Sequence, residues 1–93
     1  MIHTSHDAII LTLVPTKYFQ ADLTRRKQML QNNENAAKIF YRYSGDGAPR
    51  SYACLYAGGG EFGQDLFCSP EELWLYSDTN GAILTTVTHT EAP

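Results

Sequence analysis

Residues 16–33, TKYFQADLTRRKQMLQNN, decide the predicted fold class, because apolar side chains recur there at helical spacing. Phe19, Leu23 and Leu30, with Met29 beside Leu30, follow the period of an α-helix around a charged face. Pro15 precedes the segment. Asn32 and Asn33 end it, because asparagine tolerates the left-handed conformation of a helix C-cap. The pattern predicts one long helix.

Shorter segments on both sides of this helix have the composition or the period of β-strands. They are residues 8–14, which stop at Pro15, and residues 38–43, 51–57, 61–67, 73–77 and 82–88. Residues 58–60 (GGG) and 78–81 (DTNG) predict tight hairpin connections, and Asn-Gly between two strands is a strong hairpin signal. Residues 69–72 (SPEE) also resemble a helix start, so one helical turn there is an alternative.

These elements predict an α+β fold in the order β-α-β-β-β-β-β. The sheet would be antiparallel, mostly a meander of about five to six strands, with the one α-helix packed on one face. The chain has 93 residues, which suffice for one core. We therefore expect a single domain over 1–93, with 1–7 and 89–93 as frayed ends.

Composition bounds the class of protein and its location. No apolar run approaches the roughly 20 residues that span a bilayer, and the start lacks the basic head of a secretory signal. Cys54 and Cys68 are too few for a disulfide framework and lack metal-site spacing. We therefore expect a cytoplasmic protein with reduced thiols and no contact with membranes.

Strand alternation sorts the side chains onto two faces. The face assigned to the core holds Ile39, Tyr41, Tyr43, Ala53, Leu55, Ala57, Leu73, Leu75, Ile83 and Val87. The opposite face holds Phe40, Arg42, Tyr52, Cys54, Tyr56, Trp74, Tyr76, Leu84, Thr86 and Thr88. Tyrosine, tryptophan and arginine are enriched in binding hot spots, so the second face predicts a protein-binding surface. The alternative is that these aromatic rings shield one another on a half-exposed sheet.

The predicted partner-binding residues are aromatic anchors, one arginine and five acids: Phe40, Arg42, Tyr52, Tyr56, Trp74, Tyr76, Glu61, Asp65, Glu71, Glu72 and Asp78. The five acidic residues are included because charge is distributed unevenly along the chain. Residues 1–50 hold seven basic and four acidic residues, whereas residues 51–93 hold six acidic residues and neither lysine nor arginine. Such an acidic half favours a basic partner and faster association at low salt.

The sequence contains only weak signals for a catalytic site or a metal site. If the first and last strands were neighbours, His3, His6 and His89 could converge on zinc, but terminal residues are usually mobile. The glycine-rich residues 58–63 lack the Gly-Lys-Ser/Thr of a phosphate loop. No Ser or Cys has an evident His and acid beside it. We therefore predict no enzyme activity and no catalytic, cofactor-binding or metal-binding residues.

The function predicted from these features is that of a small, acidic, non-enzymatic binding protein that occupies a partner protein's surface. A stoichiometric inhibitor or immunity protein fits this description, including one that blocks a basic nucleic-acid-binding surface of a nuclease complex. One alternative is an RNA or single-strand binder that uses Arg25, Arg26 and Lys27 with the tyrosines, although a pI of 5.4 disfavours nucleic acid. Another is a homodimeric structural domain.

Overall fold

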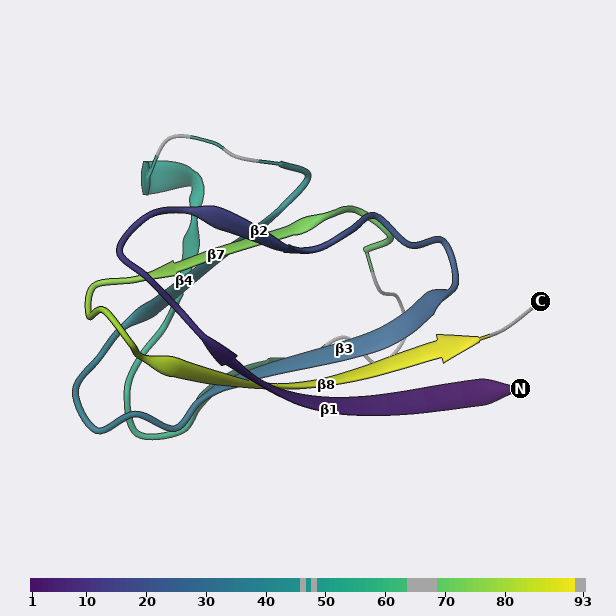
Figure 1. The fold of residues 1–93 in the computed structure, drawn as a ribbon, viewed down its shortest axis with the longest axis horizontal. Helices are drawn as coiled ribbons and strands as arrows, with labels where there is room; N and C mark the ends of the chain where they lie inside the picture. Colours follow the sequence, from purple (N-terminus) through teal and green to yellow (C-terminus); the bar gives the residue numbers. More distant parts are fainter. Residues whose placement is uncertain (46, 48, 64–68, 92–93) are drawn as a thin grey trace.

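A computed structural model describes residues 1–45, 47, 49–63 and 69–91, and these residues form eight β-strands (Figure 1). The strands are β1 (Ile2–Ile10), β2 (Thr16–Phe19), β3 (Arg25–Asn32), β4 (Ile39–Tyr43), β5 (Ala53–Leu55), β6 (Gly60–Gly63), β7 (Leu73–Ser77) and β8 (Ile83–Glu91). A short 3-10 turn, η1 (Pro49–Ser51), precedes β5. No α-helix is present among the described residues, so the α+β prediction was wrong.

The strands form two four-stranded antiparallel sheets that face each other. The β1 sheet has the order β1-β8-β3-β6, and the β2 sheet has the order β2-β7-β4-β5. The pairs β1·β8, β2·β7, β3·β6 and β4·β5 are nested, as if one long hairpin had been rolled into two layers. This nested pairing in two sheets is the jelly-roll arrangement.

The core lies between the two sheets and consists mainly of leucine. Its fully buried members are Leu11, Leu30, Ile39, Leu55, Leu73, Leu75 and Leu84. Tyr41, Tyr43 and Phe62 pack around it, with the rings of Tyr41 and Phe62 5.0 Å apart. The second sheet therefore covers the apolar face that the predicted helix was expected to cover.

The predicted helix over residues 16–33 is replaced by two strands in different sheets. Phe19 lies in β2 and Leu30 lies in β3, while Leu23 between them is exposed. Along β3, every second residue from Gln28 to Asn32 points into the core, and two of these three residues are polar. Buried polar side chains hid the two-residue period, and the helical spacing of the apolar residues was coincidental.

Polar groups can occupy inward positions of β3 because each finds a partner. The Gln28 amide donates to the Thr88 hydroxyl at 3.2 Å. The Asn32 amide donates to the carbonyls of Ala37 at 2.7 Å and Leu55 at 2.9 Å, and its oxygen accepts from the backbone N–H of Glu34. Hydrogen bonding thus offsets the cost of burying these amides.

The expected meander was wrong as well, because two predicted hairpins are connections between sheets. Residues 78–82 link β7 of the β2 sheet to β8 of the β1 sheet, and residues 56–59 link β5 to β6 in the same way. Gly81 adopts φ +88° in the turn, but the strands on either side of it, β7 and β8, lie in different sheets and do not pair with each other. The β4·β5 pair is a true hairpin. Residues 69–72 form no helical turn.

The face assignment was wrong for β8. Leu84 and Thr86 are buried in the core, whereas Ile83 is exposed and Val87 lies on the outer face beside Met29. The phase of β8 is set by its two neighbours, because Thr86 lies opposite the buried Leu30 of β3 and Leu84 opposite Ile9 of β1. In the β2 sheet, the predicted core residues Ile39, Leu55, Leu73 and Leu75 are buried, whereas Ala53, also assigned to the core, is exposed.

Candidate functional site

The longest free edge in the described structure belongs to β1. All nine residues from Ile2 to Ile10 pair with β8 without a register shift, from Ile2 opposite Glu91 to Ile10 opposite Ile83. No strand of the described chain pairs with the other side of β1, which is the edge of its sheet. Figure 1 shows β1 and β8 running together toward the two termini, beyond the strands of the β2 sheet. A sheet edge of this length is a template for another strand.

The direction in which the main-chain N–H and C=O groups of β1 point follows from the hydrogen bonds of Leu11, the residue directly after β1. The N–H of Leu11 donates to the carbonyl of Ala82 at 2.8 Å, and the Leu11 carbonyl accepts from Gly81 at 2.9 Å. The N–H and C=O groups of Leu11 therefore point toward β8. Because direction alternates along an antiparallel strand, the N–H and C=O groups of residues 2, 4, 6, 8 and 10 point to the free edge.

The side chains of β1 are almost all exposed, on both faces. Residues 2, 4, 6, 8 and 10 lie on the outer face of the β1 sheet, and residues 3, 5, 7 and 9 lie on the side of the β2 sheet. The four-residue strand β2 reaches only the Ile9 end, where the Tyr18 hydroxyl donates to the Ile10 carbonyl at 3.3 Å. The half of β1 from Ile2 to Asp7 is therefore uncovered on both faces.

The β1 edge lacks the devices that usually block strand addition. It contains neither proline, lysine nor arginine, and its pairing has no bulge. Its one carboxylate, Asp7, accepts a hydrogen bond from the Ser5 hydroxyl at 3.0 Å. By contrast, β2 is short and irregular between Lys17 and Phe19, and β5 has three residues. Among the described edge strands, β1 offers the longest edge without a register shift.

The predicted aromatic residues do lie together, on the outer face of the β2 sheet. Phe40 and Tyr76 stack with ring centroids 4.7 Å apart, and Tyr52 meets Tyr76 edge-on at 5.0 Å. Trp74 lies opposite Arg42 in the β4·β7 pair. Tyr56 follows β5 and is exposed, with the Lys38 ammonium 5.8 Å from its ring. Three of these rings, Phe40, Tyr52 and Tyr76, therefore contact one another before any partner binds.

The predicted acidic residues are spread over the molecule. Glu72 accepts a hydrogen bond from the Trp74 indole at 2.9 Å and pairs with Lys17 at 3.6 Å, so it belongs to the aromatic face. Asp78 accepts the backbone N–H of Lys38 at 2.9 Å. Glu61 lies on β6 in the other sheet, and Glu71 is exposed before β7. Asp65 lies outside the described residues.

The basic residues of the nucleic-acid alternative do not share a face. Arg25 is buried and donates to three carbonyls, of Gln20, Ser69 and Glu71, at 2.8 to 3.1 Å. Arg26 is exposed and pairs with Glu91 at 3.2 Å. Lys27 lines a hollow on the outer face of the β1 sheet. The basic helix that this alternative required is absent from the described residues.

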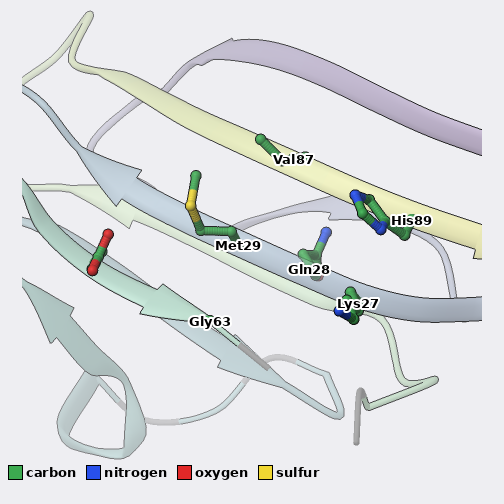
Figure 2. Close-up of a pocket in the computed structure, with 7 residues that line it drawn as sticks. Lys27, Gln28, Met29, Gly63, Val87 and His89 are labelled. Atoms are coloured by element: carbon green, nitrogen blue, oxygen red, sulfur yellow. The ribbon is translucent and has the colours of Figure 1, made fainter. Parts of the chain in front are cut away.

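The first and last strands are neighbours, but the three histidines do not converge. His6 and His89 lie on the outer face at diagonal positions of β1 and β8, whereas His3 points to the opposite side. His89 also lines the open hollow of about 380 Å³ shown in Figure 2, with Lys27, Met29, Glu61 and Val87. The described residues contain no group of three His, Cys, Asp or Glu side chains that could hold a metal ion.

Cys54 is a free thiol on the aromatic face, where it lies opposite Phe40. Partial burial raises the pKa of this thiol above its usual value, because the charged thiolate loses hydration there. Cys54 is therefore less nucleophilic at neutral pH than an exposed cysteine. Cys68 lies outside the described residues.

Sequence reasoning missed the β1 edge, because residues 1–7 were expected to fray. Residues 1–7 contain neither glycine nor proline, which is compatible with a strand. The pairing partner, β8, lies at the other end of the sequence, so no local signal identified it.

The described residues contain no helix long and apolar enough to cross a membrane. No family model and no curated protein matches the sequence. Among solved structures, the chain is similar to a protein of the Bacillus endospore appendages, which form a family of disulfide-linked pili. The TM-score is 0.51 at 10% sequence identity, over 99% of this chain and 88% of the other. At this identity, the likeness shows a shared two-sheet fold.

Proposed function

We propose that this protein is a non-enzymatic structural domain that associates with copies of itself through the free edge of β1. The observation that carries the proposal is that β1, a strand of nine residues, is paired on one side only. It has neither a proline nor a bulge to block the free side, and its one carboxylate is that of Asp7. The five alternate residues 2, 4, 6, 8 and 10 offer N–H donors and C=O acceptors that a second strand can satisfy.

Strand addition is favoured at β1 because its backbone is already extended. A second strand gains a ladder of main-chain hydrogen bonds without β1 having to fold first. The side chains of β1 add apolar area at both ends through Ile2 and Ile10. The pilus protein with the similar fold is part of an assembled appendage, which is in keeping with association, although identity is only 10%.

Binding of a different protein through the aromatic face remains the prediction made from the sequence. Three of its rings are packed against one another, and its acids are dispersed, so the described surface favours it less than the β1 edge. Nothing in the comparisons supports an inhibitor, an immunity protein or a nucleic-acid binder. These more specific functions stay predictions.

The test compares two neighbouring proline variants. Ala8→Pro removes an N–H that points to the free edge, whereas Asp7→Pro removes an N–H that bonds to β8. Sedimentation velocity over a concentration series should show wild-type protein heavier than its 10.4 kDa monomer, and Ala8→Pro as a monomer. In dilute solution, where wild type is also monomeric, Ala8→Pro should melt near wild type and Asp7→Pro at a lower temperature.

Ala36→Pro, an exposed alanine in the β3–β4 connection, controls for the presence of proline and should still associate. The proposal is wrong if wild type stays monomeric up to about 1 mM, the weakest affinity that such a measurement resolves. It is also wrong if Ala8→Pro associates as wild type does.

A further inference from the structure

Three large apolar side chains on the outer face of the β1 sheet have no cover in the monomer. Ile2 is 61% exposed at the start of β1, Ile10 is 67% exposed at its end, and Ile83 of β8, opposite Ile10, is 44% exposed. Ile2 lies at one end of β1, and Ile10 and Ile83 lie at the opposite end. An antiparallel pairing of β1 with itself brings these two ends together.

We propose that β1 pairs with β1 of a second copy around a two-fold axis at His6, which gives a closed dimer. This inference rests on the proposed self-association and names its geometry. In this register Ile2 lies opposite Ile10 of the second copy, Thr4 opposite Ala8, and Ser5 opposite Asp7. The contact is isologous, so both copies use the same surface and no free β1 edge is left to continue a fibre.

The His6 centre is favoured over its neighbours by length and by charge. A symmetric antiparallel pair must centre on one residue, because directly opposite side chains lie on the same face. Centring on His6 pairs all nine residues of β1, and any other centre leaves part of the strand unpaired. Centring on Asp7 also places two carboxylates directly opposite each other, which is destabilising.

The main-chain groups match in the same register. Residues 2, 4, 6, 8 and 10 point outward, and the His6 centre pairs each of them with another member of that set. Each outward N–H and C=O therefore faces a complementary group. The Ile10 carbonyl additionally accepts a hydrogen bond from the Tyr18 hydroxyl of its own chain. The result is one continuous sheet in which each copy contributes its β6-β3-β8-β1 strands.

The side chains are compatible with this pairing on both faces. On the outer face, Ile2 of one copy packs against Ile10 of the other, which lies beside Ile83 in its own sheet, and this contact occurs twice because of the symmetry. On the inner face, the Ser5 hydroxyl meets the Asp7 carboxylate of the second copy, an acceptor it already bonds within its own chain. The β2 sheet leaves room there, because β2 covers only the Ile9 end of β1.

Cysteine cross-linking tests the register in a full-length background in which Cys54 and Cys68 are both replaced by serine. Directly opposite residues in a hydrogen-bonded pair have Cα atoms about 5.5 Å apart. That separation lies within the range of about 4.4–6.8 Å that a disulfide spans. With diamide as oxidant, His6→Cys should cross-link to itself. Thr4→Cys alone and Ala8→Cys alone should not, whereas a mixture of these two should.

The outcomes separate this inference from the proposed function. Self-cross-linking of Thr4→Cys or Ala8→Cys in place of His6→Cys means a shifted register and overturns the His6 centre. A wild-type dimer in which the three cysteines fail to cross-link, both alone and in every pairwise mixture, means self-association through another surface. A chain that is monomeric by sedimentation overturns both.

A second variant measures the apolar contact independently of cysteine chemistry. Ile2→Ala should weaken dimerisation by about tenfold or more, because the truncated contact occurs twice in each dimer. Leu23→Ala is the matched control, since Leu23 is 83% exposed and lies outside β1. An unchanged dissociation constant for Ile2→Ala contradicts the His6 register.

Discussion

The Tyr43 hydroxyl donates a 2.6 Å hydrogen bond to Oε1 of Gln28 and so joins β4 of one sheet to β3 of the other. Gln28 is almost fully buried, and its amide nitrogen donates onward to Thr88 of β8. Three strands are thereby connected through one inward-facing glutamine. A polar network of this kind helps to fix one packing of the two sheets, provided that its members stay bonded.

Tyr43→Phe should lower the free energy of unfolding by about 1–3 kcal/mol, because it leaves the buried Gln28 oxygen without this donor. Denaturant unfolding measures the change. Tyr18→Phe is the matched control, since the Tyr18 hydroxyl makes only a 3.3 Å bond at the surface. A loss no larger than that of Tyr18→Phe would mean that water replaces the Tyr43 hydroxyl without cost.

Arg25 holds the segment before β7 onto β3. Its guanidinium donates to the carbonyls of Ser69 and Glu71 and, on the other side, of Gln20. Arg25→Lys should destabilise the fold by about 2 kcal/mol or more, because one ammonium group cannot reproduce the planar set of bonds to three carbonyls.

Arg26→Ala is the control for Arg25. Its ion pair with Glu91 is half exposed on both sides, so the expected loss is below about 1 kcal/mol. Thermal unfolding of both variants checks the ranking. Equal effects would show that the buried guanidinium contributes no more than the exposed one.

Alternation separated the two faces of the β2 sheet, and the set with smaller residues was assigned to the core. In β4 and β7 the inward residues Ile39, Leu73 and Leu75 are apolar and the outward residues are larger and more polar, so the two-residue period is visible in the sequence. The same period placed Phe40 and Tyr76 on one outer face, where they stack. Local chemistry and tertiary position agree in these strands.

The β1 sheet was not predictable in this way, because β3 and β8 carry polar residues inward. Gln28 and Asn32 are buried in β3, which was predicted as a helix, and Thr86 and Thr88 are buried in β8, which was predicted as a strand with its other face inward. Both features depend on partners far along the chain, such as Thr88 opposite Gln28. Long-range pairing overrode the local helical signal.

The stability of the protein should fall at acidic pH in part through Asp22. The N–H and the hydroxyl of Thr24 donate to Oδ1 of Asp22 at 2.9 and 2.6 Å and hold the pKa of this carboxyl below its usual 3.8. A lowered folded-state pKa means that the carboxylate stabilises the fold above pH 3.8. This contribution disappears as the pH falls through the folded-state value.

NMR titration of the Asp22 carboxyl checks the cause. Thr24→Val removes the hydroxyl donor but keeps the backbone donor, so the pKa of Asp22 should rise toward its usual value without reaching it. Asp22→Asn should be less stable than wild type at pH 6, and the difference should shrink as the pH falls below 3.8. A difference independent of pH would assign the effect to packing instead of charge.

Two tyrosines distinguish a packed aromatic face from a binding face. Tyr52 is 8% exposed and meets Tyr76 edge-on, whereas Tyr56 is 64% exposed. Tyr52→Ala should therefore cost about 3 kcal/mol or more of stability, in the range of buried aromatic truncations. Tyr56→Ala should leave the melting temperature within about a degree, because its ring buries little area. If Tyr56→Ala also leaves every association of the protein unchanged, the predicted aromatic binding surface loses its most exposed anchor. If it weakens binding to another protein while Ala8→Pro does not, the aromatic face and not the β1 edge is the functional surface.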